Sequence, residues 1–183
     1  MKKVLIIFGI VLLIVLVGAG YVASRFGMLN HRAPAAPYVP PPPPPIPDGF
    51  TRYENAAYHF ALAYPSDLTP KEFDEGKGAE TITFTGATSA DGFQIFITPY
   101  GDTQITSSRI ALDTRNTASG IQQKTFTGGE SQQISALTFS SKDPHGQPMQ
   151  EVWFLHGHYL YEVSTYEGTE EWFSQMLSTL EEK

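Results

Sequence analysis

The sequence predicts an α+β fold, an antiparallel sheet flanked by helices in an αβα sandwich, preceded by one N-terminal transmembrane helix. Three observations predict it. Residues 4–22 are apolar and carry no charge. Several later segments alternate between large and small or between apolar and polar residues, which is typical of strands. Two amphipathic patterns, one between strands and one near the end, indicate helices packed on the sheet.

The first segment, residues 1–23, is predicted to be a membrane anchor with a short cytoplasmic N-terminus. Its apolar stretch spans roughly 28 Å as a helix, close to a hydrocarbon core of about 30 Å. Two lysines lie directly before this stretch, and two arginines follow it at a greater distance. Because basic residues next to a membrane span favour the cytoplasmic side, we expect the C-terminal domain outside the cytoplasm. The alternative is a cleaved signal peptide, whose apolar region is about 7–15 residues long. The greater length here favours retention.

Residues 24–47 form a predicted Pro-rich linker that holds nine of the 14 prolines. The run Pro40–Pro45 lacks amide donors and favours an extended left-handed helix, a strut of roughly 19 Å. Such a segment serves as a stiff spacer or as a docking ligand for an aromatic groove. Next to a membrane anchor, the composition favours the spacer.

Residues 48–183 are predicted to form the globular domain, which contains four strand patterns before residue 142. They cover Tyr58–Tyr64, Thr81–Thr85, Gly92–Thr98 and Ser135–Ser141. Pro65–Asp67 predicts a turn, residues 86–91 a hairpin connection, and residues 143–148 a loop.

A helix is predicted over residues 106–118. Thr106 can cap its N-terminus, and Ile110, Thr114 and Ala118 share one face. Gly120 is expected to close it.

Residues 150–164 predict a hairpin. Val152, Phe154 and His156 alternate with Glu151 and Trp153 before an expected two-residue turn at His156-Gly157. A final helix follows, with Thr169 as its cap. Its apolar stripe consists of Trp172, Phe173, Met176, Leu177 and Leu180.

The stretch from Tyr53 to Leu180 resembles the PsbP/Mog1-like domain family. The likeness lies in the aromatic strand Tyr58–Tyr64 followed by Pro-Ser, in the hairpin at 151–164, and in the closing helix. The resemblance implies a central antiparallel sheet between helices and an accessory protein rather than an enzyme, as in family members that serve photosystem II or a Ran-type GTPase. The chain is most similar to bacterial membrane-anchored PsbP-like members. The matched positions are structural and imply no functional residues.

Composition excludes several classes of function. All 19 acidic residues lie at or after Asp48, together with eight of the 12 basic ones, which gives the domain a formal charge of −11. That charge repels phosphate backbones, so we expect no nucleic-acid partner. The chain has no cysteine, which excludes thiol nucleophiles, disulfides and cysteine-ligated metals.

Two groups of residues are weak candidates for metal ligands. Asp74 and Glu75 lie in an expected acidic loop, and oxygen-rich loops suit calcium. His156 and His158 flank a glycine, and an H-x-H pair on a strand can ligate zinc. The simpler interpretations are a solvated acidic face and the chemistry of a hairpin turn. We therefore predict no cofactor.

No catalytic motif is present. Gly76-Lys77-Gly78 lacks the rest of a phosphate-binding loop, and no serine lies in a G-x-S-x-G elbow. Glu151 and Glu162 are expected to be exposed on neighbouring strands. The sequence thus predicts a protein that is not an enzyme.

Four aromatic residues are weak candidates for partner binding, because strand alternation brings some of them to the surface. They are Tyr100, Trp153, Tyr161 and Tyr166. The alternative is that helices cover both faces of the sheet. Together these features predict a membrane-anchored, extracytoplasmic binding or accessory module for an envelope protein. A small-ligand or metal-binding domain is the alternative, and a hydrolase is the third possibility.

Overall fold

The computed structural model describes residues 45–88, 92–129, 132–166 and 170–182. The predicted anchor and nearly all of the predicted linker lie outside these residues. No helix within the described ranges is long and apolar enough to span a membrane. The limits of anchor, linker and domain remain predictions from the sequence.

Seven antiparallel strands form the larger sheet, in the order β3-β4-β5-β9-β8-β7-β6. Two meanders, β3 to β5 and β6 to β9, join through the β5–β9 pair, and the chain passes between the meanders through helix α2. The strands are β3 (Thr69–Gly76), β4 (Ala79–Thr85), β5 (Gly92–Pro99), β6 (Ser119–Thr127), β7 (Gln133–Lys142), β8 (Pro148–His156) and β9 (Tyr159–Tyr166).

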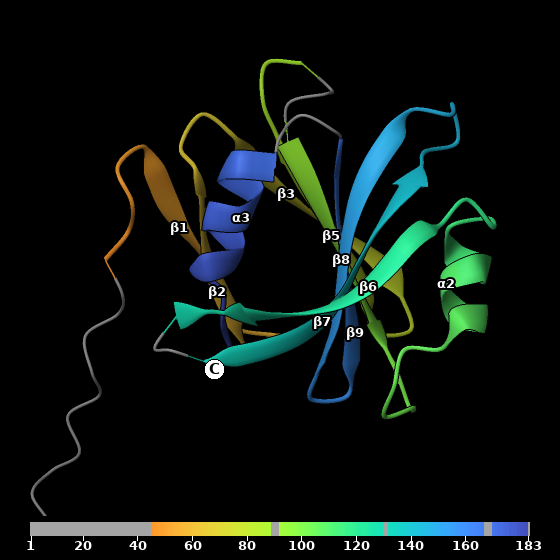
Figure 1. The fold of residues 1–183 in the computed structure, drawn as a ribbon. Helices are drawn as coiled ribbons and strands as arrows, with labels where there is room; N and C mark the ends of the chain where they lie inside the picture. The colour runs from red at the N-terminus through yellow and green to blue at the C-terminus, as the bar shows by residue number, and fades with distance from the viewer. Residues whose placement is uncertain (1–44, 89–91, 130–131, 167–169, 183) are drawn as a thin grey trace, which may run out of the picture. The chain divides into compact units, whose positions relative to one another are not determined.

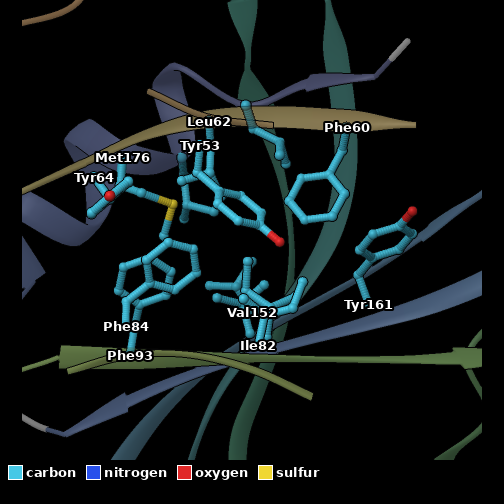
Figure 2. Close-up of a cluster of buried hydrophobic side chains, with 14 of the residues drawn as sticks. Tyr53, Phe60, Leu62, Tyr64, Ile82, Phe84, Phe93, Val152, Tyr161 and Met176 are labelled. Atoms are coloured by element: carbon cyan, nitrogen blue, oxygen red, sulfur yellow. The ribbon is translucent and has the colours of Figure 1, made fainter. Parts of the chain in front are cut away.

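One face of this sheet is covered by a second, smaller sheet and by helix α3 (Glu170–Ser178) (Figure 1). The small sheet pairs β1 (Phe50–Asn55) and β10 (Glu181–Glu182) on either side of β2 (Phe60–Pro65). Aromatic side chains from both sheets meet between them (Figure 2). Phe84 and Phe93 of the large sheet stack at 4.3 Å between ring centroids, near Met176 of α3. This is the main core of the domain.

The opposite face is covered by α2 (Ser107–Asp113), which lies across the sheet from α3 (Figure 1). Ile110 of α2 packs there on Phe139, Trp153 and Leu160. A helix of seven residues is about 10 Å long, whereas seven strands spaced by about 4.8 Å are about 29 Å wide. Helix α2 therefore covers only part of this face.

The structure confirms the α+β prediction in its coarser form, a mostly antiparallel sheet with helices packed on it. All four strands predicted before residue 142 are present, and so is the hairpin at 150–164. The αβα sandwich is only partly realised, because the flanking helices are few and the small sheet replaces helices over much of one face.

Helix α2 is shorter than predicted. Thr106 does cap it, accepting a bond from the Arg109 amide at 3.1 Å. The helix ends at Asp113 rather than near Ala118, because Arg115 and Asn116 have φ values of 53° and 62° in the left-handed region. The prediction that Gly120 closes the helix is wrong.

The predicted acidic loop at 72–80 is also wrong. These residues form the β3–β4 hairpin, with left-handed backbone from Gly76 to Gly78 at its tip. The late hairpin turns at Gly157-His158, one residue beyond the expected position, because Gly157 supplies the positive φ of 58°. In α3 the predicted apolar residues Phe173, Met176 and Leu177 are buried. Thr169 and the side chain of Trp172 lie outside the described residues.

Candidate ligand cavity on the α2 face

A cavity of about 510 Å³ lies on the part of the sheet that α2 leaves uncovered. Its walls come from β4, β5, β8 and β9, from the C-terminal end of α2, and from the loop between β7 and β8. Buried side chains, among them Glu151, Trp153 and Glu162, lie at its base. Exposed side chains, such as Gln94 and His145, surround its mouth. Its volume is in the range of small-molecule sites.

The strand register brings the base residues together. Glu151 lies opposite Ser164 and Trp153 lies opposite Glu162 on the paired strands β8 and β9. The two glutamates are therefore diagonal neighbours on one face, at about 7–8 Å between their Cα atoms. Gln94 of β5 lies opposite Ser164, next to this pair. Residues from three strands thus converge on one small area.

Glu151 is 8% exposed, and two neutral donors hold its carboxylate. The Ser141 hydroxyl donates to Oε1 at 2.6 Å, and the Trp153 indole donates to Oε2 at 3.0 Å. Burial raises the pKa of Glu151 above its usual value, and the two hydrogen bonds oppose that rise only in part. Among the described residues, no lysine, arginine or histidine forms an ion pair with it.

Glu162 is 9% exposed and has a cation beside it. Nη2 of Arg109, from α2, donates to Glu162 Oε1 at 3.1 Å. Nε of the same guanidinium contacts Asp113 one turn further along the helix. Burial raises the pKa of Glu162 to about 8, the charge of Asp113 adds to the rise, and Arg109 opposes it. The two buried glutamates therefore differ in one respect, because within the described part of the chain a cation pairs with Glu162 and none pairs with Glu151.

The β7–β8 loop forms one rim of the cavity. Oδ1 of Asp143 accepts bonds from the amides of His145 and Gln147, both at 2.8 Å, which fix the loop. Desolvation alone would raise the pKa of Asp143, but these two backbone bonds, with His145 and Tyr166 nearby, together outweigh it and lower the pKa. The Tyr166 hydroxyl reaches Asp143 Oδ2 at 3.4 Å. Tyr166 is half-buried in the cavity wall.

The structure separates the four aromatic candidates. Trp153 and Tyr161 are only 2% and 1% exposed, so these two candidates for partner binding do not reach the surface. Trp153 lies under α2, and the Tyr161 hydroxyl donates to the carbonyl of Tyr58 in the main core. Tyr100 is half-buried beside Arg109, with 6.0 Å between its ring centroid and the guanidinium carbon. For Tyr100 and Tyr166 partner binding stays a prediction.

The metal candidates do not assemble into a site. Within the described residues, no three His, Asp or Glu side chains are placed to hold a metal ion. Asp74 and Glu75 accept local hydrogen bonds in the β3–β4 hairpin. The Gly76 amide donates to Asp74, and the Thr81 hydroxyl donates to Glu75. His156 is at the end of β8 against the ring of Tyr161, and His158 is exposed in the following turn.

Comparison with known proteins adds a likeness of fold. No protein-family model matches the sequence, and no curated protein matches it. The fold is similar to the solution structure of cyanobacterial PsbP (CyanoP) from Synechocystis sp. PCC 6803. The TM-score is 0.49 at 10% sequence identity, over 74% of this chain and 93% of that chain. This structure bears the same family name as the resemblance noted in the sequence.

Sequence reasoning missed the cavity and wrongly placed its two glutamates in solvent. The signal that could have found them is the alternation itself, which puts Glu151 and Trp153 on one face of β8. The same alternation puts Glu162 on that face of β9. Arg109 gave no signal, because its contact with Glu162 joins residues 53 positions apart.

Proposed function

We propose that this chain is a binding module whose ligand occupies the cavity on the α2 face. The observation that carries the proposal is the pair of glutamates, Glu151 and Glu162, buried at the base of a cavity of about 510 Å³. Buried charge is costly, and apolar residues of similar size are often as stable or more stable. Ionisable groups with raised pKa values in a cleft are therefore candidates for a functional site.

The module is proposed to be membrane-anchored and extracytoplasmic, with an envelope protein as its partner. Support for this part comes from the sequence: the uncharged stretch at 4–22, the Pro-rich segment at 24–47 and the acidic domain that follows. The proposal assigns the chain no catalytic activity, because its sequence carries none of the catalytic motifs considered above. Nucleic acid is not a proposed partner.

Site-specific photo-crosslinking tests the cavity as the binding site. A photoreactive amino acid replaces Gln94 or His145 in the full-length chain, in the cells that make it. These two positions border the cavity from different elements. Gln122, exposed on β6 and outside the cavity, is the matched control. We expect one shared adduct from positions 94 and 145 and none from 122. Equal labelling at all three positions, or no adduct, contradicts the proposal.

The absence of cysteine permits a clean test of the proposed topology. Asp102→Cys places one thiol at an exposed position of the domain, and Lys2→Cys places one before the predicted anchor. A membrane-impermeant maleimide should label position 102 in intact cells and position 2 only after permeabilisation. The reverse pattern would contradict an extracytoplasmic domain.

A further inference from the structure

The lining of the cavity is predominantly acidic. Among the described residues that line it, four are acidic, Asp113, Asp143, Glu151 and Glu162, and two are basic, Lys142 and His145. Lys142 is exposed at the mouth and pairs through its backbone with Pro148 at the end of the sheet. A hollow lined mainly by one sign of charge concentrates ligands of the opposite sign.

The two buried glutamates differ in the groups that pair with their carboxylates. Glu162 receives its counter-ion from α2 through Arg109. Glu151, equally buried on the next strand, receives only neutral donors. A buried carboxylate is stabilised when a cation completes its surroundings, because the attraction then offsets the cost of desolvation. Both glutamates border the cavity, so a ligand there can reach Glu151, which has no ion-pair partner among the described residues.

The wall beside Glu151 is aromatic. Phe96 and Tyr166, both half-buried, border the cavity, while the buried Trp153 contributes the indole N–H that is hydrogen-bonded to the carboxylate. Aromatic faces attract ammonium and guanidinium groups and also pack on aliphatic chains. A side chain or small molecule with an apolar stem and a cationic head matches both surfaces.

We infer that the cavity takes an ammonium or guanidinium group on an aliphatic stem, with Glu151 as its counter-ion. This inference rests on the proposed function, since it assigns the chemistry of the ligand in the same cavity. Two sources present such a group, a free amine and a lysine or arginine side chain of a partner protein. The experiment distinguishes them.

The probes for the test are n-butylammonium, n-butylguanidinium, neutral n-butanol and the anion butyrate. Each is titrated into the full-length chain in neutral detergent and followed by calorimetry and NMR. We expect the two cations to bind and the neutral and anionic probes to bind at least about 10-fold more weakly, because only a cation pairs with the buried carboxylate. Equal binding of n-butanol, or no binding of either cation, overturns the inference.

Variants assign the binding to Glu151. Glu151→Gln keeps the shape of the side chain and should weaken cation binding at least about 10-fold. Glu75→Gln, the same change of charge at an exposed position of the β3–β4 hairpin, should leave it unchanged. Gln94→Trp fills the cavity and should abolish binding of every probe, whereas Gln122→Trp should not. Cation binding that Glu151→Gln leaves unaltered but Gln94→Trp removes would overturn the cation inference and leave the binding cavity standing.

Wild-type protein supplies a readout that needs no variant. A bound cation favours the ionised form of Glu151, so binding measured at the pH of that carboxyl group's own titration midpoint should displace a proton. Binding heats measured at one pH in two buffers with different ionisation enthalpies should then differ, in the direction of proton release. Identical heats in the two buffers would contradict the role given to Glu151.

The source of the cation is tested with two further ligands. A short peptide with one central lysine is compared with the same peptide acetylated at that lysine. Tighter binding of the lysine peptide than of n-butylammonium, lost on acetylation, identifies a partner side chain as the source. Tighter binding of the free amine identifies a small molecule. Binding of the acetylated peptide equal to that of the lysine peptide overturns the inference for a protein partner.

Discussion

The Trp153 indole nitrogen donates to Oε2 of Glu151 at 3.0 Å, between two buried residues on the same face of β8. The Ser141 hydroxyl on β7 donates to the other oxygen at 2.6 Å. The carboxylate is therefore fixed from two sides, and no cation in the described ranges forms an ion pair with it. This arrangement holds a buried charge in a defined place, and its consequences can be measured.

Removing one donor should destabilise the domain in a pH-dependent way. Ser141→Ala leaves a buried carboxylate oxygen without its bond, which costs about 1–3 kcal/mol of the free energy of unfolding. The loss should be larger at pH 8 than at pH 4, where the carboxyl group is protonated. Urea unfolding at both pH values measures it. Ser140→Ala, on the opposite face of β7, is the control. Equal effects of the two substitutions would contradict the role of Ser141.

Glu162 should make stability fall as pH rises. Its pKa is about 8 in the folded domain, above the usual value of 4.5, so the folded state binds the proton more tightly than the unfolded chain. Its contribution is complete below about pH 4.5 and is lost as pH rises towards 8. The melting temperature of Glu162→Gln minus that of wild type should therefore increase from pH 5 to pH 9. A constant or decreasing difference would be inconsistent with this linkage.

The ion pair between α2 and β9 should appear in a double-mutant cycle. Arg109→Gln leaves two carboxylates, Glu162 and Asp113, without their shared cation. We expect a loss of about 1–3 kcal/mol at pH 8 for this half-buried pair and a coupling energy with Glu162→Gln of about 1 kcal/mol. Arg115→Gln, at an exposed position after the helix, should change stability by less than about 0.5 kcal/mol. A coupling energy of zero would show that the contact contributes nothing.

The β8–β9 turn should depend on one glycine. Gly157 has a φ of 58°, and a Cβ at this position meets no neighbouring atom, so only backbone strain opposes a side chain. Gly157→Ala should cost about 1–2 kcal/mol by chemical denaturation. Gly101→Ala is the matched control, because Gly101 has the same open space without a positive φ. Equal stability of the two variants would disprove the strain.

Local signals in the sequence predicted much of the fold. Thr106 marks the start of α2 because its hydroxyl can cap a helix, and the glycine after His156 marks a turn because only glycine adopts a positive φ freely. Strand β6 was not predicted. Its residues are almost all exposed, so burial imposes no alternation on them.

The cavity depends on relationships that no local pattern contains. It requires the β5–β9 pair, which places Gln94 opposite Ser164, and it requires α2 to end at Asp113. It also depends on how much of the sheet face α2 and the neighbouring loops cover, because that cover makes Glu151 buried rather than exposed. These are properties of strand order and helix length, and they appear only once the chain is folded.

The most direct test of the binding cavity is the titration of Glu151 itself. The carboxyl ¹³C shift of this residue is followed by NMR in the full-length chain, with and without n-butylammonium. We predict a midpoint above the usual glutamate range in the free protein and a lower midpoint with the cation present. A midpoint near the ordinary value of about 4.3, unchanged by the cation, would contradict a buried carboxylate that binds a cationic ligand.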